Sequence, residues 1–423
     1  MLLASEGDPD GLDIPIPRNH AEAVSGPWAS YWIAVEEAKM ASYRSTGTYI
    51  NAVPPPGTNV VSGMWLYKVT WPPGSPPVFK ARYKARGFSQ REGVYFFQTF
   101  APTPKMTTLR VLLHIAAQRD YELHSLDFST AFLKGSLHEQ IWLRRPPGFA
   151  GSFPPGTQWQ LRRPVYGLRQ APCEWHDALR TTLTALEFFP SSTDPSLFVR
   201  RGSTPFFVLV YVDDLVFATP DQHALASVKE ELQRRHTCTD LGELQRYLGL
   251  QITRDRAART ITLTQSHMVE QILTRFRFPF PKVQPTPLAV DHGLHLRTSH
   301  LSPAVHILSL WVVSYIDLPT GTLLRGMGLV LGGKQPVTLT GYSDSSWADD
   351  AESLWSTYGY CFSLGIGAVS WRLTQASSVS SSSCEAEVYA VAMAAQELHW
   401  LSFLLTDLGE RPRSPPVLFA DTS

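Results

Sequence analysis

Cysteine is scarce in this chain, and long apolar runs are missing. The 423 residues include four cysteines that lie far apart and form no C-x-x-C pair: Cys173, Cys238, Cys361 and Cys384. Their spacing argues against a zinc site and against a disulfide framework, and it fits a reducing compartment. The N-terminal segment MLLASEGDPD turns acidic at once and lacks the basic region of a secretory signal peptide. No apolar run approaches the ~18 residues that a membrane span needs. We therefore expect a soluble intracellular protein that is not secreted and has no membrane partner.

Net charge is also lacking, because 37 Lys and Arg residues balance 37 Asp and Glu residues. The basic residues are nevertheless clustered. Between Val78 and Arg110 a single acid, Glu92, stands against seven basic residues: Lys80, Arg82, Lys84, Arg86, Arg91, Lys105 and Arg110. A second basic region contains Arg144, Arg145, Arg162, Arg163, Arg169 and Arg180. These clusters are either solvated faces or parts of a groove for a phosphate backbone.

The length of the chain is sufficient for two or three domains with their own cores. We expect residues 1–27 to be disordered, 28–274 to form a first domain and 327–423 a second one. The segment 275–326 between them begins with the proline-rich stretch RFRFPFPKVQPTP and predicts a linker and an irregular connection. Sheets with helices on one face predict α+β folds for both domains.

Local patterns predict the elements of each domain. Helices are expected near 28–40, 107–120, 172–186 and 221–236, with a long one from about residue 384. Strands are expected over 63–71 and 122–128, in hairpins over 207–219 and 247–265, and near 328–331, 337–343, 358–372 and 416–420.

The stretch FVLVYVDDLVFAT (207–219) places two adjacent carboxylates, Asp213 and Asp214, between two apolar strands. A hairpin turn is one explanation, since Asp is a good turn former. A metal site is the other, because two neighbouring anions beside apolar strands repel each other unless something positive neutralises them. The stretch alone favours neither.

A third carboxylate, Asp127, stands at the end of another predicted strand, in SLDFSTAFLKG. If that strand pairs beside the hairpin, Asp127, Asp213 and Asp214 converge. Three carboxylates can hold two divalent cations about 4 Å apart, the arrangement that in-line phosphoryl transfer uses. Carboxylate oxygens with open water positions suit Mg²⁺.

An ordered series of stretches extends this pattern over about Trp28 to Leu288. It contains FKARYKARGFSQREG, TFAPTPKMTTLR, LDFSTAFLKGSLHEQIW, RRPPGF, YGLRQAPCEW, DPSLF, YVDD and DLGELQRYLGLQI. This part of the chain closely resembles the reverse transcriptases of copia-type long-terminal-repeat retrotransposons. The resemblance implies a right-hand polymerase with fingers, palm and thumb. Its implied activity is RNA-directed DNA synthesis on an RNA template, with dNTPs added to the 3′-hydroxyl of a DNA primer.

The resemblance also implies roles for single residues. Asp127, Asp213 and Asp214 match the catalytic ligands of two Mg²⁺ ions, which Mn²⁺ can replace. Phe132 matches the aromatic gate that excludes a ribose 2′-hydroxyl, although an isolated phenylalanine is more often a core residue.

Four other residues match positions around the substrate. Lys80 and Arg82 match fingers residues that grip the triphosphate, and solvated surface is the alternative for both. Gln170 matches a residue that lines the nucleotide pocket, and a surface amide is its alternative. Leu248 and Gly249 lie in a stretch similar to the primer grip, or in the core of a strand.

The second domain resembles, through LTGYSDSSWADD, STYGYCFSLGIGAVSW, SSSCEAEVYA and VLFADTS, the ribonuclease H domain that follows copia polymerases. Asp344, Glu387 and Asp421 match its three metal-binding acids. For Glu387 the alternative is an acid placed early in a helix for the helix dipole. The chain ends two residues after Asp421. We therefore expect an incomplete ribonuclease H-like α/β domain without useful cleavage activity.

Two stretches depart from the family pattern. Tyr95 and Phe96 replace its usual Asp-Tyr pair, and HLSPAVHILSLWVVSYIDLPTG does not resemble its usual connection. The alternative function is thus a catalytically idle remnant that at most binds nucleic acid. The resemblance places the protein in a cytoplasmic retrotransposon particle or in the nucleus.

Overall fold

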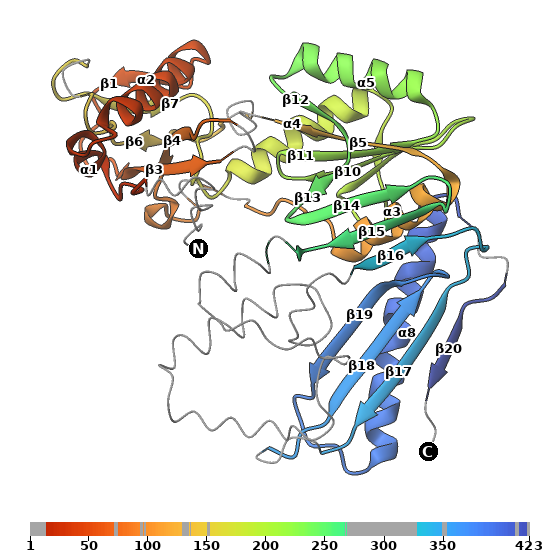
Figure 1. Cartoon of the computed structure of the whole chain (residues 1–423). Coiled ribbons are helices and arrows are strands. Elements are labelled where there is room, and N and C mark those ends of the chain that lie inside the picture. The colour runs from red at the N-terminus through yellow and green to blue at the C-terminus, as the bar shows by residue number, and fades with distance from the viewer. Residues whose placement is uncertain are drawn as a thin grey trace.

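The structure is a computed structural model that describes residues 14–71, 75–93, 96, 99–128, 135, 137–149, 153–266, 268, 328–348, 353–410 and 414–420. Three parts follow one another in space (Figure 1): an N-terminal unit, a central sheet with its helices, and a C-terminal unit reached through a second, smaller sheet.

The N-terminal unit is built around aromatic side chains. Its elements are α1 (His20–Ser25), α2 (Ala29–Ser45), β1 (Tyr49–Ala52), β2 (Val60–Val61), β3 (Gly63–Thr70), β4 (Val78–Ala85), the 3₁₀ turn η1 (Gly87–Ser89), β6 (Trp142–Leu143) and β7 (Gln158–Leu161). β3 and β4 form a two-stranded antiparallel ribbon. The ring of Trp32 on α2 lies edge-on against Tyr67 and Phe79 on the ribbon, and these contacts fix α2 to it.

The start of the N-terminal unit corrects one expectation. Residues 1–27 were expected to be disordered, but the described part, from residue 14, contains α1. The Asn19 side chain caps this helix by accepting a hydrogen bond from the Glu22 N–H. Ala23 is fully buried and Ile14 is 7% exposed. Tertiary packing therefore outweighs the acidic and proline-bearing composition of this segment.

The central sheet has six strands in the order β12-β5-β11-β10-β9-β8. Their bounds are β5 (Glu122–Asp127), β8 (Phe189–Pro190), β9 (Leu197–Arg200), β10 (Phe206–Tyr211), β11 (Asp214–Thr219) and β12 (Thr239–Glu243). β10 and β11 form the expected hairpin. Phe206 and Val208 face one hydrophobic cluster, and Phe207 and Leu209 face another. Because both faces of the sheet are covered here, the central strands β10 and β11 are buried at almost every position instead of alternating.

Three helices cover the two faces of the central sheet. α4 (Ala171–Ala185) and α5 (Gln222–Arg235) belong to the first cluster, and α3 (Met106–Arg119) belongs to the second. The N-terminus of α3 is capped from a distant loop, since the Asp194 carboxylate accepts from the Lys105 N–H and the Thr108 hydroxyl. The sequence predicted these three helices to within two residues at each end.

The second sheet, in the order β13-β14-β15-β16, contains a strand that was expected elsewhere. Its bounds are β13 (Arg246–Tyr247), β14 (Leu250–Asp255), β15 (Thr260–Thr264) and β16 (Leu329–Gly332). We expected β16 to open the C-terminal domain, but it pairs with β15. Gly332 has φ +96°, and a Cβ atom there would lie 2.4 Å from the Arg259 carbonyl oxygen. Only glycine allows this close approach.

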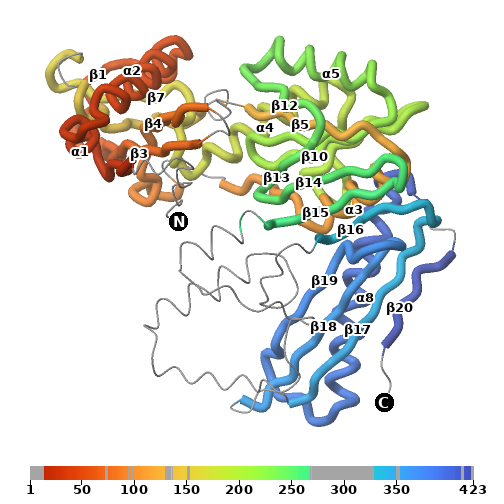
Figure 2. The backbone as a smooth tube through the Cα atoms, in the orientation of Figure 1, coloured from red at the N-terminus to blue at the C-terminus, as the bar shows by residue number. Residues whose placement is uncertain are grey.

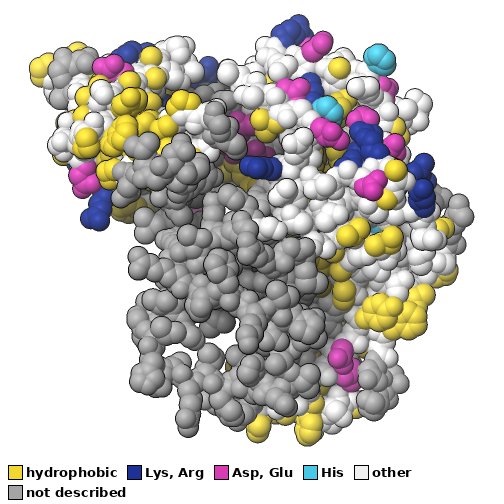
Figure 3. Space-filling view, viewed as in Figure 1, with side chains coloured by type: hydrophobic (Ala, Val, Ile, Leu, Met, Phe, Trp, Pro, Cys, Tyr) yellow, Lys and Arg dark blue, Asp and Glu magenta, His cyan; other side chains and the backbone are white. Residues whose placement is uncertain are grey.

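The C-terminal unit is a four-stranded sheet backed by one long helix (Figure 2). Its elements are β17 (Thr340–Ser346), β18 (Thr357–Ser363), β19 (Ala368–Gln375), α8 (Ser383–Asp407) and β20 (Val417–Ala420), in the sheet order β19-β18-β17-β20. The segment 358–372, expected as one strand, is the hairpin β18–β19. Hydrophobic side chains gather over β17 and β20 (Figure 3), where Tyr342 and Phe419 stack with ring centroids 5.4 Å apart.

Helix α8 has the length and mean hydropathy of a membrane span, 1.2 over an 18-residue window, although no apolar run of that length was expected from the sequence. Its Ala386, Ala390 and Ala394 are buried against the sheet, and Leu401, Leu404 and Leu405 are buried in a core shared with α3. α8 is therefore the packed helix of a globular unit.

Polar contacts join the C-terminal unit to the central part. Arg119 of α3 forms a bidentate ion pair with Glu410, with N–O distances of 2.9 and 2.7 Å. The Arg110 guanidinium lies 3.8 Å from the ring centroid of Trp371. The Asp407 carboxylate accepts hydrogen bonds from Ser191 and Thr193. Because the buried core is also continuous, the two parts pack as one body.

Candidate active site

The turn of the β10–β11 hairpin carries two of the acids. Tyr211 and Asp214 are its last paired residues, so Val212 and Asp213 form a two-residue turn. Val212 has φ 54°, whereas Asp213 does not have a positive φ. A positive φ at the first central residue is typical of a type II′ turn, where glycine is favoured. A β-branched residue in that conformation is strained. The turn interpretation is therefore correct, but it leaves the pair of acids unexplained.

The third acid lies on the neighbouring strand. β5 pairs with β11 so that Asp127 stands directly opposite Asp214. The Phe128 N–H donates to the Asp213 carbonyl oxygen at 2.9 Å, which ties the end of β5 to the turn. Like charges directly opposite on paired strands are destabilising. The fold has therefore placed three acids together where they would be costly without a positive partner.

Burial and mutual repulsion change the titration of this group. The pKa of Asp214 is raised to about 6, first by burial and then by the charges of Asp213 and Asp127. The pKa of Asp213 is also raised, by burial first and also by Asp127, while Arg82 acts in the opposite sense. A cation bound at these carboxylates would remove the repulsion.

The side chains do not form an ion site as they lie. In the part of the chain that the structure describes, no three His, Cys, Asp or Glu side chains are close enough to hold a metal ion together. The backbones of Asp127 and Asp214 are nevertheless directly paired, and such residues have Cα atoms about 4.5–5.5 Å apart. Side chains of directly opposed residues lie on the same face of a sheet, so this backbone spacing is compatible with a shared cation. Three carboxylates are a donor set that suits Mg²⁺.

Two residues from other elements border the acids. The Arg82 guanidinium lies 4.9 Å from the ring centroid of Tyr166. The pKa of Tyr166 is raised, by burial first and also by the charges of Asp213 and Asp127, while Arg82 acts in the opposite sense. The Ala85 N–H donates to the Tyr166 carbonyl at 2.8 Å and holds β4 against this loop. Tyr166 is part of the stretch YGLRQAPCEW, and no role was expected for it from the sequence.

The basic residues of β4 lie on one face of the ribbon. Lys80 and Arg82 are exposed, whereas the alternate residues Phe79, Ala81 and Tyr83 are buried. Lys68 of β3 stands directly opposite Lys80, which extends the basic face across both strands. Arg82 is the member of this face whose charge acts on Asp213.

Gln170 is not a surface amide. Of its two expected settings, the nucleotide pocket and the surface, its 1% exposure excludes the surface. Its Oε1 accepts from Gln90 Nε2 at 3.0 Å, and its Nε2 donates to Glu139 at 3.4 Å. Gln90 in turn accepts from the Arg169 N–H. The side chain therefore fixes the loop after η1 to the start of α4.

Three of the expected residues, Tyr95, Phe132 and Asp421, lie outside the described residues. Leu248 and Gly249 form the turn between β13 and β14, with φ values of 49° and 82°. Of the two interpretations for this pair, the structure supports a shaped backbone turn and not the core of a strand.

The acids of the C-terminal unit lie at the junction of β17 and α8. Asp344 is on β17, and Glu387 Oε1 accepts from the N–H and the hydroxyl of the next residue, Ser345, at 3.2 and 2.7 Å. Glu387 Oε2 is buried without a hydrogen-bond partner among the described residues. The first-turn acid of α8 is Glu385, which bonds to Ser381. The helix-dipole explanation therefore applies to Glu385 instead of Glu387.

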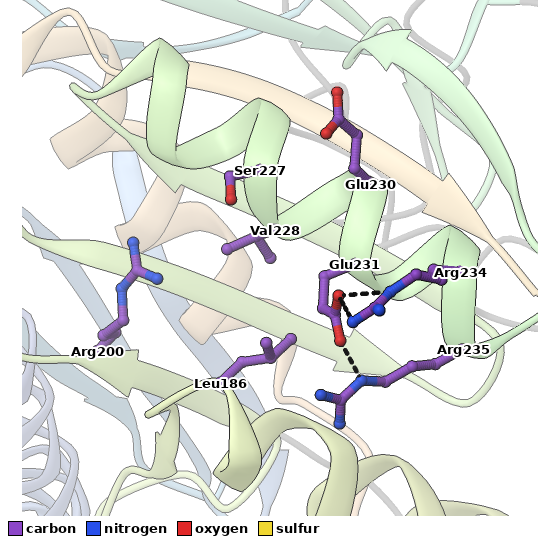
Figure 4. Close-up of a pocket in the computed structure, with 8 residues that line it drawn as sticks. All are labelled: Leu186, Arg200, Ser227, Val228, Glu230, Glu231, Arg234 and Arg235. Atoms are coloured by element: carbon purple, nitrogen blue, oxygen red, sulfur yellow. Dashed lines mark hydrogen bonds and ion pairs between the residues drawn. The ribbon is translucent and has the colours of Figure 1, made fainter.

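A groove of about 490 Å³ lies elsewhere, between α5, the end of α4 and β9 (Figure 4). Arg200, Arg234 and Arg235 line it together with Glu230 and Glu231. Glu231 accepts from both Arg234 and Arg235, so the charges of this groove are largely paired internally. Its lining contains none of the three central acids, which are Asp127, Asp213 and Asp214.

Comparisons with known proteins agree with this arrangement. Residues 48–289 match the family model described as reverse transcriptase (RNA-dependent DNA polymerase). The retrovirus-related Pol polyprotein from transposon RE2 of Arabidopsis thaliana is 32% identical over 87% of this chain and 28% of its own length. The polyprotein from transposon RE1 of the same plant is 31% identical over 92% of the chain and 30% of its own length. The one from transposon TNT 1-94 of Nicotiana tabacum is 29% identical over 97% and 33%.

The chain thus spans about a third or less of the length of these curated relatives. The family match covers more than half of the chain, including all three central acids and the ribbon β3–β4. This chain belongs to the reverse transcriptase (RNA-dependent DNA polymerase) family, in the branch of the copia-type retrotransposons.

Proposed function

We propose that the chain synthesises DNA on an RNA template by adding dNTPs to the 3′-hydroxyl of a primer. The observation that carries the proposal is the pairing of Asp127 with Asp214 beside Asp213 on a strained turn. In this proposal the N-terminal unit is the fingers, the central sheet with α3, α4 and α5 is the palm, and the sheet β13–β16 lies toward the thumb.

The three carboxylates would hold two Mg²⁺ ions, which Mn²⁺ can replace. When bound, such ions activate the attacking hydroxyl and stabilise the charge on the reacting phosphate. Asp213 and Asp214, whose pKa values are raised, must be deprotonated to act as ligands. The backbone pairing of β5, β10 and β11 holds the carbons that carry these acids at fixed spacing.

The neighbouring residues would bind the substrate. Arg82 and Lys80 donate charge-assisted hydrogen bonds to the triphosphate from the exposed face of β4. Tyr166, whose ring centroid lies 4.9 Å from the Arg82 guanidinium, would form the floor of the nucleotide site. Phe132, five residues after Asp127, is proposed as the gate against ribonucleotides, a role that rests on the sequence.

Primer extension tests the proposal directly. Purified protein is incubated with poly(rA), an oligo(dT) primer, dTTP and Mg²⁺, and product length is measured. Asp213→Asn and Asp214→Asn should each abolish extension, since each removes a ligand charge and keeps the side-chain volume. Asp255→Asn, on the exposed tip of the β14–β15 hairpin, is the matched control and should extend as the wild type does. Wild-type protein that binds the primer–template but never extends it would refute polymerase activity.

Protein that binds the primer–template without extending it would fit the second candidate function, an idle remnant that binds nucleic acid. The basic face of β3–β4 is the observation that favours it, because such a face neutralises phosphates without any metal. For the C-terminal unit we propose a ribonuclease H-like arrangement of Asp344 and Glu387, to which the sequence adds Asp421. The proposed setting is intracellular, in a cytoplasmic retrotransposon particle or in the nucleus.

A further inference from the structure

One buried tryptophan contacts the chain on both sides of the catalytic acids. Trp175 lies in the first turns of α4 and is 1% exposed. Its indole N–H donates to the carbonyl oxygen of Val212 at 2.7 Å. Val212 directly precedes Asp213 and is the turn residue with φ 54°. The hydrogen bond is therefore made to the strained residue of the acid-bearing turn.

The indole ring also packs against the residue that follows the third acid. It lies edge-on against Phe128, with ring centroids 4.9 Å apart. Phe128 directly follows Asp127, and its N–H donates to the Asp213 carbonyl. His236 closes the group, with its ring 5.5 Å from Phe128 and 5.8 Å from Trp175. A single side chain from α4 thus holds both the turn and the end of β5.

We infer that Trp175 is a positioning residue, which sets the place of Asp213 and Asp214 by holding Val212 in its strained conformation. The inference rests on the proposed polymerase function and adds to it a residue outside the ligand set. Residues in strained conformations persist only where the surroundings hold them. Without the indole N–H, Val212 can relax toward a negative φ, and the two acids after it move with the turn.

The N–H is the part of Trp175 that a purely apolar residue cannot replace. Any large ring would fill the space beside Phe128 and His236, but only a donor can hold the Val212 carbonyl. A displacement of about 1 Å in a catalytic group can reduce the rate by about a hundredfold. Because Trp175 is 1% exposed, the loss of this donor should lower turnover while the nucleotide binds nearly as before.

Trp175→Phe removes the donor and keeps an aromatic ring. In the extension assay, kcat should fall by about ten- to a hundredfold, and KM for dTTP should change less than about threefold. Trp400→Phe is the matched control. The Trp400 indole on α8 also donates to a backbone carbonyl, that of Thr193 in the central part, at 3.3 Å. The control should keep wild-type kcat.

A second variant separates positioning from simple packing. Glycine adopts a positive φ without strain, so a turn with Val212→Gly does not depend on the clamp. In that background Trp175→Phe should lower kcat by less than about threefold. If Trp175→Phe has the same effect with Val212 and with glycine, or if it changes KM alone, the inference is wrong.

Two further measurements do not depend on polymerase activity. Amide hydrogen exchange in the peptide 206–219 should be about tenfold faster in Trp175→Phe than in Trp400→Phe, the factor expected for one lost hydrogen bond. The affinity for Mn²⁺, measured by electron paramagnetic resonance without nucleotide, should also fall in Trp175→Phe alone. If the wild type extends no primer, the proposed function fails and these two measurements still decide the inference. Unchanged exchange in 206–219 together with unchanged Mn²⁺ affinity would overturn it.

Discussion

Acidification should weaken the junction between the central part and the C-terminal unit through one histidine. His114 of α3 is fully buried, and its Nδ1 accepts a hydrogen bond from the Gly332 N–H at 3.1 Å. Burial lowers its pKa to about 4, although the Leu364 backbone and the charge of Glu410 act in the opposite sense. The folded protein therefore holds this imidazole neutral where β16 and the C-terminal unit meet α3.

The sign and size of the effect follow from the two pKa values. The unfolded chain binds a proton at His114 as the pH falls below 6.5, and the folded protein does so only near pH 4. Stability from this group is complete above pH 6.5 and is lost as the pH falls from 6.5 to 4. Between pH 7 and pH 5 the contribution of His114 to the free energy of unfolding should decrease by about 2 kcal/mol, and by about 3 kcal/mol once both states are protonated.

The assay is urea unfolding at pH 7 and pH 5, followed by circular dichroism. His114→Asn keeps an acceptor for Gly332 and removes the titration, so its pH dependence should be smaller than that of the wild type by about 2 kcal/mol. Subtracting the pH dependence of His114→Asn from that of the wild type removes the contributions of all other titrating groups, which the two proteins share. His223→Asn, on the exposed side of α5, should behave as the wild type. Equal pH dependence in His114→Asn and wild type would refute the reasoning.

Three further predictions concern the activities. Phe132→Ala should admit ribonucleotides, because a smaller side chain leaves room for a 2′-hydroxyl; an unchanged preference for dNTP over rNTP in the extension assay would contradict the gate. Lys80→Ala with Lys84→Ala should reduce the salt dependence of primer–template binding by about 2 in log–log slope, since each phosphate contact contributes about 0.9, and binding that is already independent of salt in the wild type would contradict the placement. The C-terminal unit should not cleave the RNA strand of an RNA–DNA hybrid with Mg²⁺ or Mn²⁺, because Ser345 already occupies Glu387 Oε1; cleavage that disappears in Glu387→Gln would contradict this.

Much of the site could be predicted from residues that are neighbours in the sequence. The hairpin around Asp213 and Asp214 follows from two apolar strands that are separated by a short polar turn. The helices α3, α4 and α5 follow from their apolar periodicity. The ordered series of motifs identified the family, and the family model that matches residues 48–289 confirms it.

Contacts between distant segments could not be predicted in this way. Asp127 and Asp214 are 87 positions apart, and only the register of β5 against β11 places them opposite each other. β16 joins β15 across a long intervening segment, because β15 has a free edge that accepts it. Gln170 is buried and its amide bonds to Gln90 of the N-terminal unit, a contact that no local pattern predicts.

What the sequence by itself determined is therefore which residues carry the chemistry and which local elements bear them. The tertiary structure decided how these elements meet: the opposition of the acids, the strained φ of Val212 and the indole of Trp175 that holds it. The physical reason is that periodicity and turn preference act over a few residues. Strand register and buried hydrogen bonds instead depend on which distant surfaces pack together, and no single stretch of the chain contains that information.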